Sequence, residues 1–295
     1  MTGGVPTHLG GRAVAARHTE EPNFFGPSGS KVFSVRYEPT VAPLGAVILC
    51  PTIHNEMLKH QRREVLLARA LADRGLAVLR FHYRGMGQSD GDAADLTFDS
   101  MADDARAAAA HLAAMIGDGP MALTGVRIGA LVAGAVADDV GARALALWAP
   151  IDDGRSYIRE GYRVRTITGV AVEWASAPSE RPDDELARVG VIDIVGCPIH
   201  RELVESLIGK TLLGVVGPGV GSVLLAPFLK QDALPVKLAT TAAAWEEAGK
   251  QVTALPTDEP ETWWYFDGMW RQRPPFTALL EATVDWLAAR LRPAS

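Results

Sequence analysis

The sequence contains little cysteine, no leader-like segment and no long apolar run. Its two cysteines, Cys50 and Cys197, cannot form a disulfide framework, and a reducing compartment accounts for their scarcity. Residues 1–21 contain Gly, Arg and His and lack the continuous apolar stretch of a signal peptide. No later apolar run is long enough to cross a bilayer, so we expect no membrane span and a cytoplasmic protein.

A surplus of positive charge is also missing. The 35 acidic residues exceed the 29 basic ones and leave a formal charge of −6, which gives no electrostatic reason to expect binding to nucleic acid. The composition, 48% hydrophobic over 295 residues, is sufficient for a sizeable core in one domain with an insertion or in two small domains. We expect neither a metal ion nor a cofactor.

Apolar runs and amphipathic segments alternate strictly through the first half of the chain. Continuous apolar runs predict buried strands at 45–50, 77–81, 121–124 and 144–148, after a half-exposed strand at 31–37. Helical spacing of apolar residues predicts helices at 58–76, 97–116 and 128–139. Parallel neighbours cannot be joined by a hairpin, so this alternation predicts an α/β fold: a mostly parallel central sheet with helices on both faces.

The alternation breaks at Pro150 and resumes at Ser222. Between them, residues 151–221 carry mixed signals, including a polar arm, a short strand at 191–195 and a helix near 201–208. A strand at 222–226, a helix at 235–248, a strand at 251–255 and a helix at 276–291 follow. We therefore predict a mobile tail at 1–21, a core at 22–150 and 222–295, and a cap inserted at 151–221.

One turn between a buried strand and a helix reads Thr124-Gly-Val-Arg-Ile-Gly129. Glycines two residues before and after a central residue suit a tight strand-to-helix elbow, because a side chain at either position would collide with neighbouring backbone. This frame resembles the nucleophile elbow Gly-x-Ser-x-Gly of α/β-hydrolases, with Arg127 in the place of serine. The loop Arg84-Gly-Met-Gly-Gln-Ser89 resembles the Arg-Gly-x-Gly-x-Ser loop that lies one strand earlier in that superfamily.

Within the superfamily, the chain resembles the serine-aminopeptidase-like hydrolases found with exosortase systems, called exosortase A system-associated hydrolase 2. Three further stretches carry this likeness, at 51–63, 147–157 and 194–203, and it extends from about Gly45 to the C-terminus. The resemblance implies an α/β-hydrolase fold with a cap. It also implies that arginine at the elbow is characteristic of the subfamily.

An arginine changes what the elbow can do. A guanidinium stays protonated, so Arg127 can be neither nucleophile nor general base. With the N–H groups and positive dipole end of the following helix, it can form an anion site for a carboxylate, a phosphate or a developing enolate. The alternative interpretation is an arginine neutralised by a neighbouring acid.

The other members of a Ser-His-Asp triad are also missing. All seven histidines lie at or before His200, and where the resemblance places the catalytic histidine the sequence has Glu259, Glu261, Trp263 and Trp264. An acid could come from Asp152, Asp153 or Asp232, but without a histidine it has nothing to orient. Both losses argue against ordinary hydrolysis.

The segment Pro51 to Glu56 follows the first central strand, from which the superfamily supplies an oxyanion-hole N–H. His54 and Glu56 are therefore candidate proton-transfer groups beside Arg127. The alternatives are an exposed loop histidine and a structural Glu56–Arg127 bridge. We predict substrate contacts from the residues that surround this point: Thr52, Ile53, Val126, Ile128, Asp153, Tyr157, Asp232, Trp263 and Trp264.

Two functions remain open. The first is a small-molecule enzyme that acts on an acyl or carboxylate-bearing substrate without a serine, by hydrolysis, acyl transfer, dehydration or cyclisation. The second is an inactive pseudo-hydrolase that binds a carboxylated ligand or a partner enzyme. An Arg127 bridged to Glu56 would favour binding, and an open Arg127 beside His54 would favour chemistry.

A homodimer also remains open. A displaced nucleophile at Cys50, Ser89 or Ser222 is a further alternative, although Cys50 is better interpreted as a buried core residue. Four cap arginines, Arg155, Arg159, Arg163 and Arg165, either steer an anion or form a solvated face.

Overall fold

The computed structural model describes residues 17–117, 119–171, 180–228, 233–255, 257, 259 and 277–292. In this part of the chain, an eight-stranded sheet has the order β1-β2-β4-β3-β5-β6-β9-β11. All pairings from β4 to β11 are parallel, and β1 and β2 are antiparallel at one edge. The strands are β1 (His18–Phe25), β2 (Val32–Pro39), β3 (Gly45–Cys50), β4 (Leu76–Phe81), β5 (Met121–Val126), β6 (Ala142–Trp148), β9 (Ser222–Ala226) and β11 (Gln251–Ala254).

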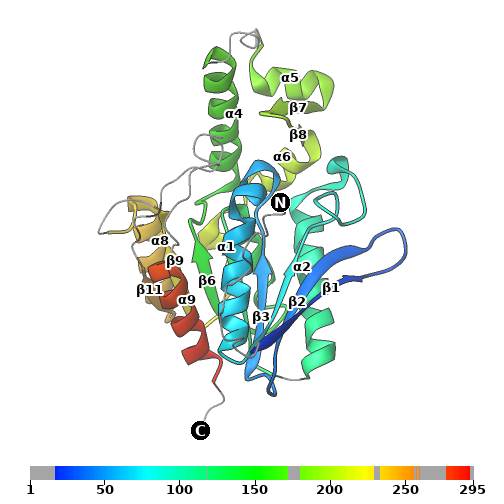
Figure 1. Ribbon diagram of the computed structural model, residues 1–295. Coiled ribbons are helices and arrows are strands. Elements are labelled where there is room, and N and C mark those ends of the chain that lie inside the picture. Colours follow the sequence, from blue (N-terminus) through cyan, green and yellow to red (C-terminus); the bar gives the residue numbers. More distant parts are fainter. Residues whose placement is uncertain are drawn as a thin grey trace, which may run out of the picture.

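Helices cover both faces of this sheet, as the alternation of the sequence predicts. Helix α1 packs beside α9, and α2 packs beside α3 (Figure 1). The core helices are α1 (His54–Asp73), α2 (Phe98–Ile116), α3 (Ile128–Val136), α8 (Val236–Glu247) and α9 (Thr277–Arg290). Strands β3, β4 and β5 are buried along their whole length, which explains their continuous apolar sequences. No helix in the described segments combines the length and apolar character needed to cross a membrane.

Strand β1 begins inside the segment predicted as a mobile tail. His18 to Glu21 pair with β2, so the predicted tail extends four residues too far. The strand lies at the sheet edge, and of its side chains only Phe25 is buried. An edge strand of this kind has no apolar alternation for sequence reasoning to detect.

Most of the described elements between residues 151 and 221 lie beyond one end of the sheet (Figure 1), whereas α7 packs against α3 and α8 of the core. The polar arm of the sequence is the long helix α4, and the predicted strand at 191–195 is one half of a hairpin whose second strand the sequence did not indicate. The elements are α4 (Gly154–Ala171), α5 (Pro182–Val189), β7 (Val191–Ile194), β8 (Cys197–His200), α6 (Arg201–Leu207) and α7 (Leu212–Val215).

Candidate functional site

The elbow has the geometry that its glycines predict. Arg127 separates β5 from α3 and has φ 54° and ψ −120°, a strained conformation for a residue other than glycine. A Cβ on Gly125 would lie 2.3 Å from the carbonyl oxygen of Gly129, and a Cβ on Gly129 would lie 2.3 Å from that of Cys50. Both glycines are therefore required by close backbone approach.

Two carboxylates hold the Arg127 side chain. Its Nε donates to Oε1 of Glu56 over 3.0 Å, and an Nη donates to Oε2 of Glu160 over 2.6 Å. The guanidinium also lies 5.7 Å from the centre of the Tyr157 ring. Burial lowers the pKa of Arg127, but the two carboxylates together raise it above its ordinary value, so the charge is permanent.

Glu56 is completely buried and has partners on both carboxylate oxygens. Besides Arg127 on Oε1, its Oε2 accepts from the hydroxyl of Thr52 and, over 3.3 Å, from that of Tyr157. Burial raises the pKa of Glu56, and Arg127 opposes that shift only in part. The structure thus gives the bridge between Glu56 and Arg127 that the sequence left as an alternative.

Sequence reasoning missed Glu160, because it lies in an arm that contains mainly Arg and Tyr. Helix α4 places Tyr157, Glu160 and Val164 on one side, where Tyr157 and Val164 are buried. The i, i+3, i+7 spacing of these three residues was the available signal. It could be used only once the arm was known to be a helix.

His54 is buried at the start of helix α1. Helix α1 begins at this residue, four positions before the predicted start, and His54 has φ 53°. It is 7% exposed, so the alternative of an exposed loop histidine is wrong. Burial, with a smaller effect of His200, lowers the pKa of His54 to about 4. Its Nε2 makes no hydrogen bond to any described residue.

The remaining predicted substrate contacts have different surroundings. The side chains of Ile53, Val126 and Ile128 are buried in the core. Asp153 accepts from both the backbone N–H and the hydroxyl of Ser156 and so caps α4. Asp232, Trp263 and Trp264 lie outside the described residues. A role in substrate binding stays a prediction for all of these residues.

An ion pair occupies the position where the resemblance places the catalytic histidine. Glu259 follows β11 and pairs with Arg63 of α1. The guanidinium of Arg63 lies 5.2 Å from the ring centre of Phe228, which follows β9. Glu259 therefore connects the loop after β11 to α1.

Two of the displaced-nucleophile candidates, Cys50 and Ser89, show no activated geometry. Cys50 is 2% exposed, and burial raises the pKa of its thiol far above the ordinary range, which favours the core interpretation. The hydroxyl of Ser89 donates to the carbonyl oxygen of His82 over 2.7 Å and accepts from the N–H of Phe33. Ser89 thus holds the loop after β4 against β2.

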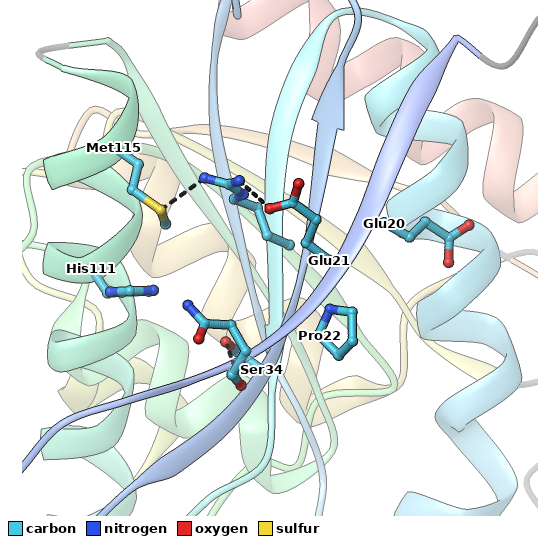
Figure 2. A pocket seen from close by; sticks show the side chains of 8 residues that line it. Glu20, Glu21, Pro22, Ser34, His111 and Met115 are labelled. Carbon is cyan, nitrogen blue, oxygen red and sulfur yellow. Dashed lines mark hydrogen bonds and ion pairs between the residues drawn. The ribbon is translucent and has the colours of Figure 1, made fainter.

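A separate hollow of about 430 Å³ lies between β1, β2 and α2. Figure 2 shows His111 and Met115 of α2 facing the strands. The Arg36 guanidinium donates to the sulfur of Met115 and to a carboxylate oxygen of Glu21. Arg36 also pairs with Glu38 over 3.2 Å. Two acids offset the positive charge of Arg36, so this hollow has no excess positive charge to attract an anion. In the described part of the chain, no three His, Cys, Asp or Glu side chains are arranged to hold a metal ion.

Comparisons with known proteins agree with this architecture. Residues 42–187 match the family described as serine aminopeptidase, S33. No curated protein matches the sequence. Est1E from Butyrivibrio proteoclasticus, solved with ferulic acid, superposes with a TM-score of 0.61 at 17% identity, over 91% of this chain and 98% of its own.

Two further solved structures give the same result. A highly thermostable carboxyl esterase from Bacillus coagulans has a TM-score of 0.62 at 15% identity, over 92% of this chain and 99% of its own. Mouse alpha/beta hydrolase domain-containing protein 10 has a TM-score of 0.54 at 15% identity, over 91% and 99%. Identities this low establish the fold alone. The protein has the α/β-hydrolase fold, and its residues 42–187 are similar to the serine aminopeptidase family.

Proposed function

We propose that this chain is a catalytically inactive member of the α/β-hydrolase superfamily that binds a small molecule through the carboxylate of that molecule. The observation that carries the proposal is the pairing of Arg127 with Glu56 and Glu160 at the elbow. The central residue of the elbow can neither attack nor accept a proton, and the sequence has no histidine after His200.

Glu160 is the partner that a ligand can replace. Its side chain is 31% exposed and belongs to α4, whereas that of Glu56 is inaccessible to solvent. A ligand carboxylate in the place of Glu160 would make the same charge-assisted hydrogen bond and would keep the buried guanidinium compensated. In the absence of ligand, Glu160 therefore acts as an internal competitor.

Ferulate is a suitable first probe, because Est1E, which has the same fold, binds ferulic acid. In a calorimetric titration, Glu160→Gln should bind ferulate about tenfold more tightly than the wild type, since the competing carboxylate is gone. The matched control is Glu185→Gln, which removes the carboxylate of another α4 ion pair, that of Arg165, and should leave the affinity unchanged.

The same preparations should neither hydrolyse p-nitrophenyl acetate nor form an adduct with a fluorophosphonate. The proposal fails if either reaction occurs. It also fails if the affinity for ferulate is the same in the wild type, in Glu160→Gln and in Arg127→Gln.

The competing candidate is an enzyme that acts on an acyl or carboxylate-bearing substrate without a serine. The raised pKa of Glu56, whose Oε2 accepts from the Tyr157 hydroxyl, favours it, because a carboxylate of raised pKa is a stronger base for proton transfer. Turnover of any ester, lactone or hydroxy acid that is lost in Glu56→Gln would establish this candidate in place of binding.

Three finer predictions belong to the same proposal. They are membership of the exosortase A system-associated subfamily, a cap role for residues 151–221, and a cytoplasmic location. A homodimer remains a prediction that light scattering on the purified chain can test.

A further inference from the structure

A hollow of about 460 Å³ lies against a different side of α4 from the one that carries Glu160. Ser156, Arg159, Tyr162 and Arg163 line it. We propose that this hollow binds the phosphate group of a small phosphate monoester. This site goes beyond the proposed carboxylate site, because it shares no residue with the elbow.

The charges on α4 support an anionic ligand. Of its five charged side chains, Glu160 is paired with Arg127, and Arg165 is paired with Glu185 over 2.8 Å. The other three are Arg155, Arg159 and Arg163, which are exposed and form no ion pair with any described residue. They repeat every four residues, a spacing at which like charges repel, so a bound anion would relieve the repulsion. The feature is distinctive in a chain of net charge −6.

Two guanidiniums in one hollow match a phosphate better than a carboxylate. Arg159 and Arg163 together carry two positive charges, and the dianion of a phosphate monoester carries two negative ones. Each planar guanidinium can also direct two N–H groups at phosphate oxygens. The volume is within the range of small-molecule sites and leaves room for the organic part of the ligand.

The two hydroxyl groups that belong to this hollow are not assigned as donors to the ligand. The Tyr162 hydroxyl oxygen is inaccessible to solvent, and burial together with Asp183 raises its pKa to about 12. The Ser156 hydroxyl already donates to Asp153 over 2.7 Å. Recognition of the phosphate therefore depends on Arg159 and Arg163.

The test is a calorimetric titration of the full chain with phenyl phosphate. Arg159→Gln and Arg163→Gln should each weaken binding about tenfold, the value expected for one charge-assisted hydrogen bond. Arg155→Gln is the matched control, because it removes the same charge from the same helix without touching the hollow, and it should change the affinity less than about twofold. Benzoate, which carries one negative charge, should bind more weakly than phenyl phosphate.

Three results would overturn the proposal. The first is that phenyl phosphate does not bind. The second is an equal loss of affinity in all three arginine variants, which would indicate only a diffuse basic face. The third is binding to phosphatidic acid vesicles without binding of phenyl phosphate. The two sites can be separated with Arg127→Gln/Glu160→Gln. That variant should lose ferulate binding and keep its affinity for phenyl phosphate, so failure of one proposal does not imply failure of the other.

Discussion

An Nη group of Arg127 donates a 2.6 Å hydrogen bond to Oε2 of Glu160, and this bond joins the elbow after β5 to helix α4. The two residues are 33 positions apart in the chain and belong to different parts of the fold. The elbow side chain, which in a hydrolase would face the substrate, here has an internal counter-ion. The contribution of Arg127 to the free energy of unfolding can therefore be measured without any ligand.

Removal of Arg127 should destabilise the fold in a pH-dependent way. Arg127→Met leaves the buried Glu56 uncompensated, and we expect a loss of about 3–5 kcal/mol in the free energy of unfolding at pH 8. A lone buried carboxyl can take up a proton, so the loss should shrink at pH 5. Urea unfolding of the wild type and the variant at both pH values measures this loss in the free energy of unfolding. Arg165→Met, which breaks the more exposed pair with Glu185, should cost less than about 1 kcal/mol at either pH.

The elbow glycines should not tolerate even a methyl group. Gly129→Ala would place a Cβ 2.3 Å and 2.4 Å from the carbonyl oxygens of Cys50 and Pro51. Alanine is intrinsically better than glycine in a helix by about 1 kcal/mol, so any loss of stability must come from the clash. We expect the melting temperature to fall by more than about 5 °C. Gly221→Ala, where nothing lies within 4 Å, should leave it unchanged.

The sequence predicted the elbow and the sheet because both depend on local constraints. Close backbone approach requires glycine at Gly125 and Gly129, and burial on both faces requires apolar runs such as β3. Glu160 was not predictable in the same way. Its role depends on how α4 packs over the core, which the i, i+3, i+7 spacing along α4 does not specify. Strand β1 was missed for a related reason, since only its partner strand identifies it.

Acid should destabilise the protein in part through His54. Burial lowers its pKa to about 4 from an ordinary value of 6.5, so the unfolded chain binds the proton more tightly. Stability from the neutral imidazole is complete above pH 6.5 and is lost as pH falls toward 4, by up to about 3 kcal/mol. His54→Asn, which tolerates the positive φ, should flatten the unfolding free energy over that window. A curve with the wild-type slope would contradict this assignment.

Glu64 should lower the stability of the protein as pH rises, which is the opposite of the effect of His54. It lies on α1 beside a small cavity that Cys50 and His60 also line, and burial raises its pKa to about 7, with Arg80 opposing. The folded protein therefore holds this proton more tightly than the unfolded chain. The contribution of Glu64 is present below pH 4.5 and is lost as pH rises to 7, by up to about 3 kcal/mol. Glu64→Gln should abolish this part of the pH dependence in chemical unfolding, and an unaltered difference between pH 5 and pH 8 would exclude it.

Restoring serine at the elbow should not restore hydrolysis. Arg127→Ser supplies a hydroxyl at the strained position, but a serine needs a base to remove its proton. The sequence has no histidine beyond His200, and Glu259, where the resemblance places that histidine, is paired with Arg63. Combining Arg127→Ser with Glu56→Gln avoids a lone buried charge, so the variant should fold, as circular dichroism can verify. Such a variant should hydrolyse p-nitrophenyl acetate no faster than the wild type, with Est1E as the positive control for the assay. Measurable turnover would mean that another group serves as the base, and it would favour the enzyme candidate over the inactive binding protein.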